Sequence, residues 1–235
     1  MVPLNDDNPT RTTPYVTYAL IIINVLIFLY ELQLSPPQLE QFFRAWAVVP
    51  ERLTASFQGE ASTLVWITLI TSQFLHGGLL HVGGNMLYLW IFGNNIEDKL
   101  GRAKYLIFYL ACGILASLAQ WVFSQNSQIP SLGASGAIAG VMGAYIIRFP
   151  KARILTLFPI FFYITVLRVP AYVFLGIWFV QQAFYGVASL NVPSTVGMES
   201  GGVAYWAHAG GFVFGALLGP VFGLFSDSNN RNRYR

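Results

Sequence analysis

Residues 133–148 of the chain read GASGAIAGVMGAYIIR, an apolar run of mostly small residues with a serine near its start and an arginine at its end. Basic residues that flank such runs lie at the membrane boundary, so Arg148 is expected at the inner surface of a bilayer. Ser135 precedes Arg148 by 13 residues. At about 1.5 Å per residue the serine lies about 20 Å from that surface, in a hydrocarbon core roughly 30 Å thick. The run therefore predicts a short helix that begins with a submerged serine.

The composition of the whole chain points to the same environment. Of its 235 residues, 55% are hydrophobic and only 10% are charged, whereas soluble domains carry about 25% charged residues. The net charge of +3 is not gathered into a basic run with aromatic residues, so no nucleic-acid partner is expected. The single cysteine, Cys112, excludes a disulfide within the chain and disfavours a thiolate metal site.

Six apolar segments are bracketed by charged residues, proline, asparagine or glycine, and each is long enough, or nearly so, to cross a bilayer. We therefore expect an all-α polytopic membrane protein with six transmembrane helices, whose surroundings are membrane lipid. The predicted spans are Tyr15–Leu34, Leu79–Ile96, Tyr105–Phe123, Ser135–Phe149, Pro170–Leu190 and Val203–Phe225. The loop 35–78 is rich in aromatic residues and is expected to lie at the outer interface.

The segment Ile154–Leu167 is apolar but too short to span, and it carries Pro159 at its centre. It is expected to lie at the interface or to fold back. Six spans then put all of the 13 Lys and Arg residues except Arg44 and Arg52 on one side, which the positive-inside rule makes cytoplasmic. The predicted organisation is a cytoplasmic tail at 1–14, a membrane domain at 15–225 and a second cytoplasmic tail at 226–235.

Polar residues fall at similar depths in three of these spans. His81, Ser135 and His208 lie near the outer ends of the second, fourth and sixth spans, which run in the same direction and can bring them together. Ionisable groups in a membrane are functional candidates. His208 could take the serine proton as a general base, which makes Ser135 a candidate nucleophile.

Groups that could stabilise a developing oxyanion lie nearby. His81 and Asn85 are spaced i, i+4, so their side chains share one face of a helix, and the backbone N–H of Ser135 is unpaired at a helix N-terminus. No aspartate or glutamate lies at this depth in the second, fourth or sixth span, which favours a Ser-His dyad over a triad. His76, just before the second span, is expected to be structural.

Packing and metal binding are alternative explanations for these residues. Gly136 and Gly140 in the fourth span, like Gly211 and Gly215 in the sixth, have the spacing of close helix contacts and are expected to be packing residues. A lone serine in a glycine-rich helix is usually a packing residue as well. Two or three histidines could bind a metal ion, but no further ligand lies near His81 and His208, so no metal is expected.

Five motifs, taken together and in order, resemble the rhomboid family of intramembrane serine proteases over about Tyr15 to Phe225. By this resemblance Ser135 is the nucleophile, His208 is the base, and His81, Asn85 and the Ser135 N–H form the oxyanion hole. Gly133, Ala134, Gly136 and Gly211 are implied as supporting residues. The motifs are Phe74-Leu75-His76, His81 to Met86, Gly93-Asn94 with Glu97 and Leu100-Gly101, Gly133 to Gly136, and Ala207 to Gly211.

The resemblance also implies a rhomboid-like bundle, a single-span membrane protein as substrate and no cofactor or metal. A gate for lateral entry would involve Trp178, Phe179, Phe184 and the segment 191–202. Six spans without a seventh are similar to the basic bacterial form of the family, which implies a bacterial plasma membrane.

The sequence departs from the family pattern at two positions. Trp66 is followed by Ile67 rather than by arginine, which affects how the first outer loop is anchored. Ala139 replaces a tyrosine that stacks on the catalytic imidazole in many members. Another residue is then expected to orient His208, with Tyr205 or Trp206 as candidates.

Two rival functions remain open from the sequence. A catalytically silent rhomboid-fold protein would bind and escort membrane clients, but such relatives typically lack the serine or the histidine. A transporter would show internal symmetry and polar groups near the midplane, whereas here the polar cluster is off-centre.

Overall fold

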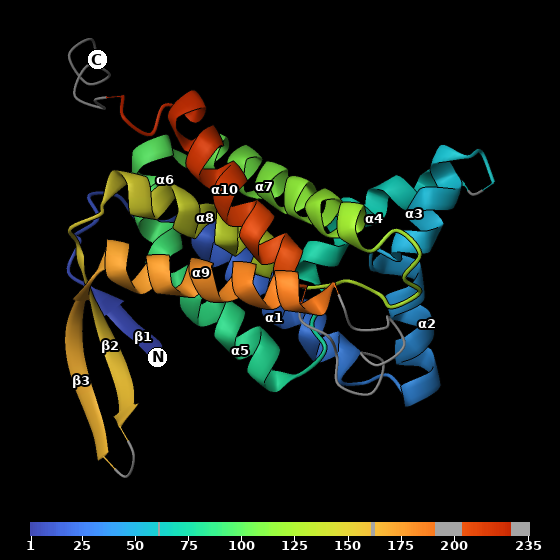
Figure 1. The fold of residues 1–235 in the computed structure, drawn as a ribbon, viewed down its shortest axis with the longest axis horizontal. Coiled ribbons are helices and arrows are strands. Elements are labelled where there is room, and N and C mark those ends of the chain that lie inside the picture. Colours follow the sequence, from blue (N-terminus) through green and yellow to red (C-terminus); the bar gives the residue numbers. More distant parts are fainter. Residues whose placement is uncertain (61, 161–162, 191–203, 227–235) are drawn as a thin grey trace.

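The computed structural model of the chain describes residues 1–60, 62–160, 163–190 and 204–226. Its centre is a bundle of apolar helices, shown in Figure 1. A π-helical turn, Leu89–Gly93, joins α5 to α6, so that these two form one helical segment. The bundle helices are α1 (Tyr15–Glu31), α5 (Leu79–Tyr88), α6 (Asn94–Leu100), α7 (Arg102–Phe123), α8 (Ser135–Arg148), α9 (Ala171–Ser189) and α10 (Tyr205–Phe222).

Each predicted span overlaps one of these helical segments, although α6 runs on to Leu100 and α7 begins at Arg102. By length and composition, α7 and α9 can cross a membrane on their own, and the bent pair Thr63–Phe74 and Leu79–Leu100 adds a third span if it is counted as one. The apolar helices α1 and α8 are shorter, with 17 and 14 residues. A count of six crossings therefore stays a prediction.

The helix α8 lies at the centre of the bundle. Its residues are buried without a break from Gly136 to Tyr145, and the core around them includes Phe92, Phe108 and Phe174. The helix begins at Ser135 after an irregular stretch that follows α7. Irregular backbone at such depth is tolerated where protein surrounds it.

Glycines allow α8 and α10 to approach until their backbones touch, and we call this contact the glycine seam. A Cβ atom added at Gly211 would lie 2.2 Å from the carbonyl oxygen of Gly136, and one added at Gly215 would lie 1.9 Å from that of Gly140. No side chain fits at either position without moving the helices apart. The predicted packing role of these glycines is confirmed.

A small sheet at one end of the bundle corrects the all-α expectation. Strands β1 (Val2–Asp6), β2 (Arg153–Ile160) and β3 (Tyr163–Pro170) form an antiparallel sheet with β2 in the middle. The segment predicted to lie at the interface or fold back thus folds back as a hairpin, which suits its many β-branched residues. The register pairs Arg153 with Pro170 and Ile160 with Tyr163, and the predicted N-terminal tail supplies β1.

The long loop after α1 lies at the opposite end of the bundle from the sheet (Figure 1). It contains α2 (Pro36–Trp46), α3 (Pro50–Phe57), α4 (Thr68–Thr71) and two 3₁₀ turns, Thr63–Ile67 and Ser72–Phe74. The ring of Phe57 packs against Trp66 at 4.8 Å and against Trp121 of α7 at 5.0 Å between centroids. Aromatic packing on α7 therefore anchors this loop.

The start of α1 is held by two acidic residues of α6. No side chain of α1 or its N-cap residue caps the helix. Instead the Glu97 carboxylate accepts hydrogen bonds from the backbone N–H groups of Val16 and Thr17 and from the Thr17 hydroxyl, at 2.8–3.0 Å. Asp98 accepts from the N–H groups of residues 11 and 12. A carboxylate at a helix N-terminus is stabilised by the unpaired N–H groups and by the dipole.

Candidate active site

The structure brings Ser135 and His208 together, although 73 residues separate them in the chain. Ser135 is the first residue of α8 and His208 lies in the first turn of α10, so the glycine seam aligns the two helix starts. The Ser135 Oγ lies 2.7 Å from the His208 Nε2. Both residues are half-buried. The pair has the separation that proton transfer from a hydroxyl to an imidazole requires.

The turn before Ser135 depends on Gly133. Its φ of +123° is a backbone conformation that residues with a side chain rarely adopt. Its N–H donates to the Ser72 carbonyl at 2.9 Å. A Cβ atom here would also lie 2.7 Å from the His81 Nε2. Gly133 therefore lets the chain turn sharply into α8 while His81 approaches the same backbone.

His81 and Asn85 project from α5 toward this turn. The N–H of Gly77 donates to the His81 Nδ1 at 3.4 Å, so the ring proton is placed on Nε2. That nitrogen faces Gly133, beside Ser135. Asn85 is buried, and its Nδ2 donates one of its two protons to the Nε2 of His76 at 2.9 Å. The second amide proton of Asn85 stays available.

His76 lies behind Asn85 in a supporting position. Its ring packs edge-on against His81, with 5.0 Å between centroids. Its backbone N–H donates to both oxygens of the buried Glu31 carboxylate at 3.2 and 3.3 Å. The end of α1 thus fixes the loop that carries His76, and the His76 side chain in turn holds Asn85 of α5. This role of Glu31 could not be predicted, because its partner lies 45 residues further along the chain.

The expectation that Tyr205 or Trp206 orients His208 is wrong. The Tyr205 ring packs on Tyr185 at 5.4 Å, and the Trp206 ring stacks on Phe123 at 3.9 Å. The partner of His208 is instead Gln182 of α9, whose Oε1 lies 2.8 Å from the imidazole Nδ1. Gln182 could have been found from the sequence as a polar residue inside an apolar span, although its side chain carries no charge.

The residues implied as a gate are placed differently from one another. Trp178 and Phe179 of α9 pack against Phe212 of α10, at 6.1 and 4.9 Å between ring centroids, and Trp178 lies 5.9 Å from the His208 ring. Phe184 is 68% exposed. The segment 191–202 lies outside the described residues.

A small polar cavity of about 20 Å³ adjoins Ser135. That volume holds about one water molecule. Among the described residues, no group of three or more histidine, cysteine, aspartate or glutamate side chains is arranged to hold a metal ion. The cavity is lined by Ser72, Gln73, Gly113, Ser117, Ser131, Leu132, Gly133, Ser135, Gly136, Ala204 and Ala207.

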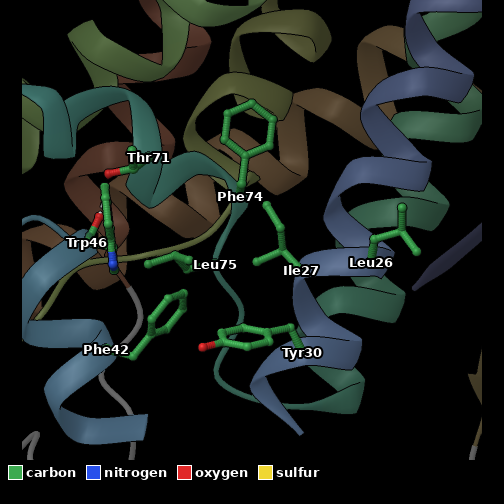
Figure 2. A pocket seen from close by; sticks show the side chains of 8 residues that line it. All are labelled: Leu26, Ile27, Tyr30, Phe42, Trp46, Thr71, Phe74 and Leu75. Atoms are coloured by element: carbon green, nitrogen blue, oxygen red, sulfur yellow. Dashed lines mark hydrogen bonds between the residues drawn. The ribbon is translucent and has the colours of Figure 1, made fainter. Parts of the chain in front are cut away.

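A larger apolar pocket of about 380 Å³ lies apart from this site, between α1 and the loop that follows it. Figure 2 shows the ring of Tyr30 on α1 facing that of Phe42 on α2, with Phe74 and Leu75 between the two helices. It shares no lining residue with the cavity at Ser135. Its eight lining residues include no histidine, carboxylate or basic side chain.

Comparison with known proteins shows the family of the chain. A profile of the rhomboid domain matches residues 63–225, which include Ser135, His208, His81 and Asn85. The chain belongs to the rhomboid family. This family is membrane-embedded, as the apolar helices indicate for this rhomboid.

Curated relatives of this rhomboid come from mitochondria and from a bacterium. Rhomboid protein 1, mitochondrial, of Saccharomyces cerevisiae is 31% identical over 207 residues, 86% of this chain and 51% of the yeast protein. Rhomboid protease GluP of Bacillus subtilis is 39% identical over 132 residues, 56% of this chain and 24% of that protein. Presenilin-associated rhomboid-like protein, mitochondrial, of Homo sapiens is 29% identical over 159 residues, 66% and 38% of the two chains.

This rhomboid therefore spans about half the length of its yeast relative and less of the other two. The family includes proteases, as the Bacillus relative's name states. The mitochondrial relatives mean that a bacterial plasma membrane has no support over another membrane.

Proposed function

We propose that this rhomboid is an intramembrane serine endopeptidase that cuts transmembrane segments of membrane proteins by a Ser135-His208 dyad. The single observation that carries the proposal is the 2.7 Å separation between the Ser135 Oγ and the His208 Nε2. A serine hydroxyl is a weak nucleophile unless a base takes its proton during attack. The name of the Bacillus relative supports proteolysis as the activity.

In the first step the Ser135 oxygen attacks the carbonyl carbon of the scissile peptide bond, and its proton passes to the His208 Nε2. The carbonyl oxygen gains the negative charge. The His81 Nε2–H, the free amide proton of Asn85 and the N–H of Ser135 supply three donors for it on the side of the nucleophile that faces α5. Such donors stabilise the transition state more than the ground state.

In the second step the imidazolium of His208 returns the proton to the leaving amine, and the C–N bond breaks. The product is an ester between Ser135 and the new carboxyl end of the substrate. A water molecule then attacks the ester carbonyl carbon and gives a proton to His208. The ester C–O bond breaks as His208 returns this proton to the Ser135 oxygen, and the new carboxyl end is released. The polar cavity beside Ser135 has room for about one water, which supports this hydrolytic half of the reaction.

The setting of the reaction is part of the same proposal. A substrate helix would enter laterally past α9 and present small residues to Ser135 near the outer face. No metal or cofactor takes part. Both termini of this multi-pass protein are proposed to lie on the inner side, with domain limits at 15 and 225.

A fluorophosphonate probe tests the proposal, because it reacts only with an activated serine. The purified full-length chain in detergent should gain one probe adduct by intact mass, and Ser135→Ala and His208→Ala should gain none while keeping their helical circular dichroism. Both variants should also fail to cut a reconstituted single-span substrate. A folded parent that gains no adduct and cuts nothing would contradict the proposal and favour a catalytically silent, client-binding rhomboid.

A further inference from the structure

Gln182 is a polar side chain that the dyad itself does not account for. It is one of five buried residues on α9, together with Ala171, Phe174, Leu175 and Gly186, and only 9% of it is exposed. A buried amide is costly to keep unless its polar atoms have partners. Its carbonyl oxygen has such a partner in the imidazole of His208, 2.8 Å away.

The chemistry of this contact determines which nitrogen of His208 carries the proton. An amide oxygen can only accept a hydrogen bond, so Nδ1 must donate and Nε2 keeps its lone pair. Nε2 is the nitrogen that lies against the Ser135 hydroxyl. Without an acceptor at Nδ1, the tautomer with its proton on Nε2 becomes available, and that tautomer cannot take the serine proton.

The neutral character of Gln182 fits its surroundings. A carboxylate in its place would also accept from Nδ1, but a buried charge carries a large desolvation penalty. An amide provides the acceptor without that penalty.

The helix that carries Gln182 is held to α10 mainly by ring contacts in this region. Phe179, one turn before Gln182, stacks on Phe212 at 4.9 Å. Gly186, one turn after it, faces the Trp206 ring, with 3.2 Å between an added Cβ and the nearest ring atom. Any movement of this part of α9 away from α10 carries the acceptor away from His208.

We propose that Gln182 is a positioning residue that holds His208 in its productive tautomer, so that activation of Ser135 depends on the seating of α9 against α10. This inference rests on the proposed function. Gln182 does not touch the substrate carbonyl, and it acts through the imidazole alone.

The decisive experiment measures the rate of fluorophosphonate labelling as a function of pH for the full chain in detergent. Gln182→Met keeps the length of the side chain and removes the acceptor, and it should label about 10- to 100-fold more slowly. Gln181→Met is the matched control, since Gln181 is exposed on the same helix, and it should label like the parent.

Gln182→Glu distinguishes positioning from packing. A carboxylate stabilises the imidazolium, so the acidic limb of the pH-rate profile should move to higher pH, with labelling within about threefold of the parent at alkaline pH. If the side chain at position 182 did not contact the imidazole, this limb would stay unchanged. The same variant decides the matter if Gln182→Met proves unfolded by circular dichroism.

A double-mutant cycle tests the dependence on α9. Phe179→Ala should slow labelling severalfold in the parent and add little in the Gln182→Met background, because the acceptor is already gone. Val180→Ala is its control, since Val180 is exposed on the same helix, and it should have no effect. Independent, multiplicative losses would overturn the link to α9.

The outcomes separate the inference from the function on which it rests. If the parent labels at Ser135 while Gln182→Met and Gln182→Glu match its rate and pH profile, the inference is overturned and the proposed function stands. If the folded parent does not label at any pH, both are overturned.

Discussion

Of the helices that pack against α10, α8 and α9 do so in very different ways. On one side α8 meets it along the glycine seam, where backbone touches backbone and a Cβ at Gly143 would lie 1.9 Å from the Phe212 carbonyl oxygen. On the other side α9 meets it through side-chain rings at centroid distances of 4.9–6.1 Å. The seam aligns Ser135 with His208, whereas the ring contact positions Gln182, the hydrogen-bond partner of His208. The tighter of these two contacts thus lies beside the proposed nucleophile and base.

The largest effect is expected where a side chain is forced into the seam. Gly215→Val should abolish labelling and cleavage and lower the thermal stability, because its Cβ has no room beside the Gly140 carbonyl and the helices must separate. A displacement of 1 Å at reacting atoms can cost about 10²-fold in rate. Gly176→Val on α9 is the matched control, since an added Cβ there meets nothing within 4 Å. Equal losses in the two variants would erase the contrast between the helices.

Asn85→Ala should separate chemistry from packing. It leaves the seam intact and removes one oxyanion donor, so we expect turnover to fall about 10²- to 10³-fold with little change in melting temperature. Single-turnover cleavage of a reconstituted substrate measures this. An alanine variant as fast as the parent would remove Asn85 from the oxyanion hole.

Glu97→Gln should alter the packing at the start of α1 and leave the proposed active site unchanged. The amide keeps an acceptor but weakens the charge-assisted bonds to the start of α1, and we expect a loss of about 1–2 kcal/mol in unfolding free energy. Unfolding in mixed micelles measures the loss. Labelling below the melting transition should be unchanged, and a slower rate there would show that the far end of the bundle reaches the site.

The smallest effect is expected at the sheet. Burial raises the pKa of the Asp6 carboxyl to about 6 from its usual 3.8, although hydrogen bonds from Tyr145 and Asn95 lower it. A carboxyl whose pKa is raised by folding contributes stability that is fully present below pH 3.8 and is lost as the pH rises through 6. The parent should therefore lose more stability than Asp6→Asn between pH 4 and 6, measured by thermal unfolding. Parallel curves would show that Asp6 does not titrate in this range.

Much of the site could be predicted from the sequence because it rests on local signals. The spacing of His81 and Asn85 follows from helix geometry, and the depths of Ser135 and His208 follow from counting residues to a charged end. The expectation of close helix contacts came from glycine spacing alone. Each of these features depends on one helix and its direction in the membrane.

The features that the sequence did not reveal depend on contacts between distant segments. The sheet was missed because β1 lies in a polar tail, and its partner β2 lies about 150 residues away. The contact between Gln182 and His208 was not predicted, because Gln182 lies in the fifth span and nothing in its spacing links it to the polar residues of the second, fourth and sixth spans. A buried neutral amide, like a buried charge, indicates a hydrogen-bond partner. Whether Gln182 is buried depends on how the helices pack, and the sequence alone does not show that.

The pairing of β1 with β2 has a consequence for biosynthesis. Val2 pairs with Leu157 and Asp6 with Ile154, so β1 is translated long before its partner strand, which is made only after α8 is complete. Until then β1 has no strand to pair with, and α1 has to enter the membrane before the sheet forms. Once β2 is translated, β1 can pair with it. The pairing of β1 with β2 therefore forms late, when most of the bundle has already been synthesised.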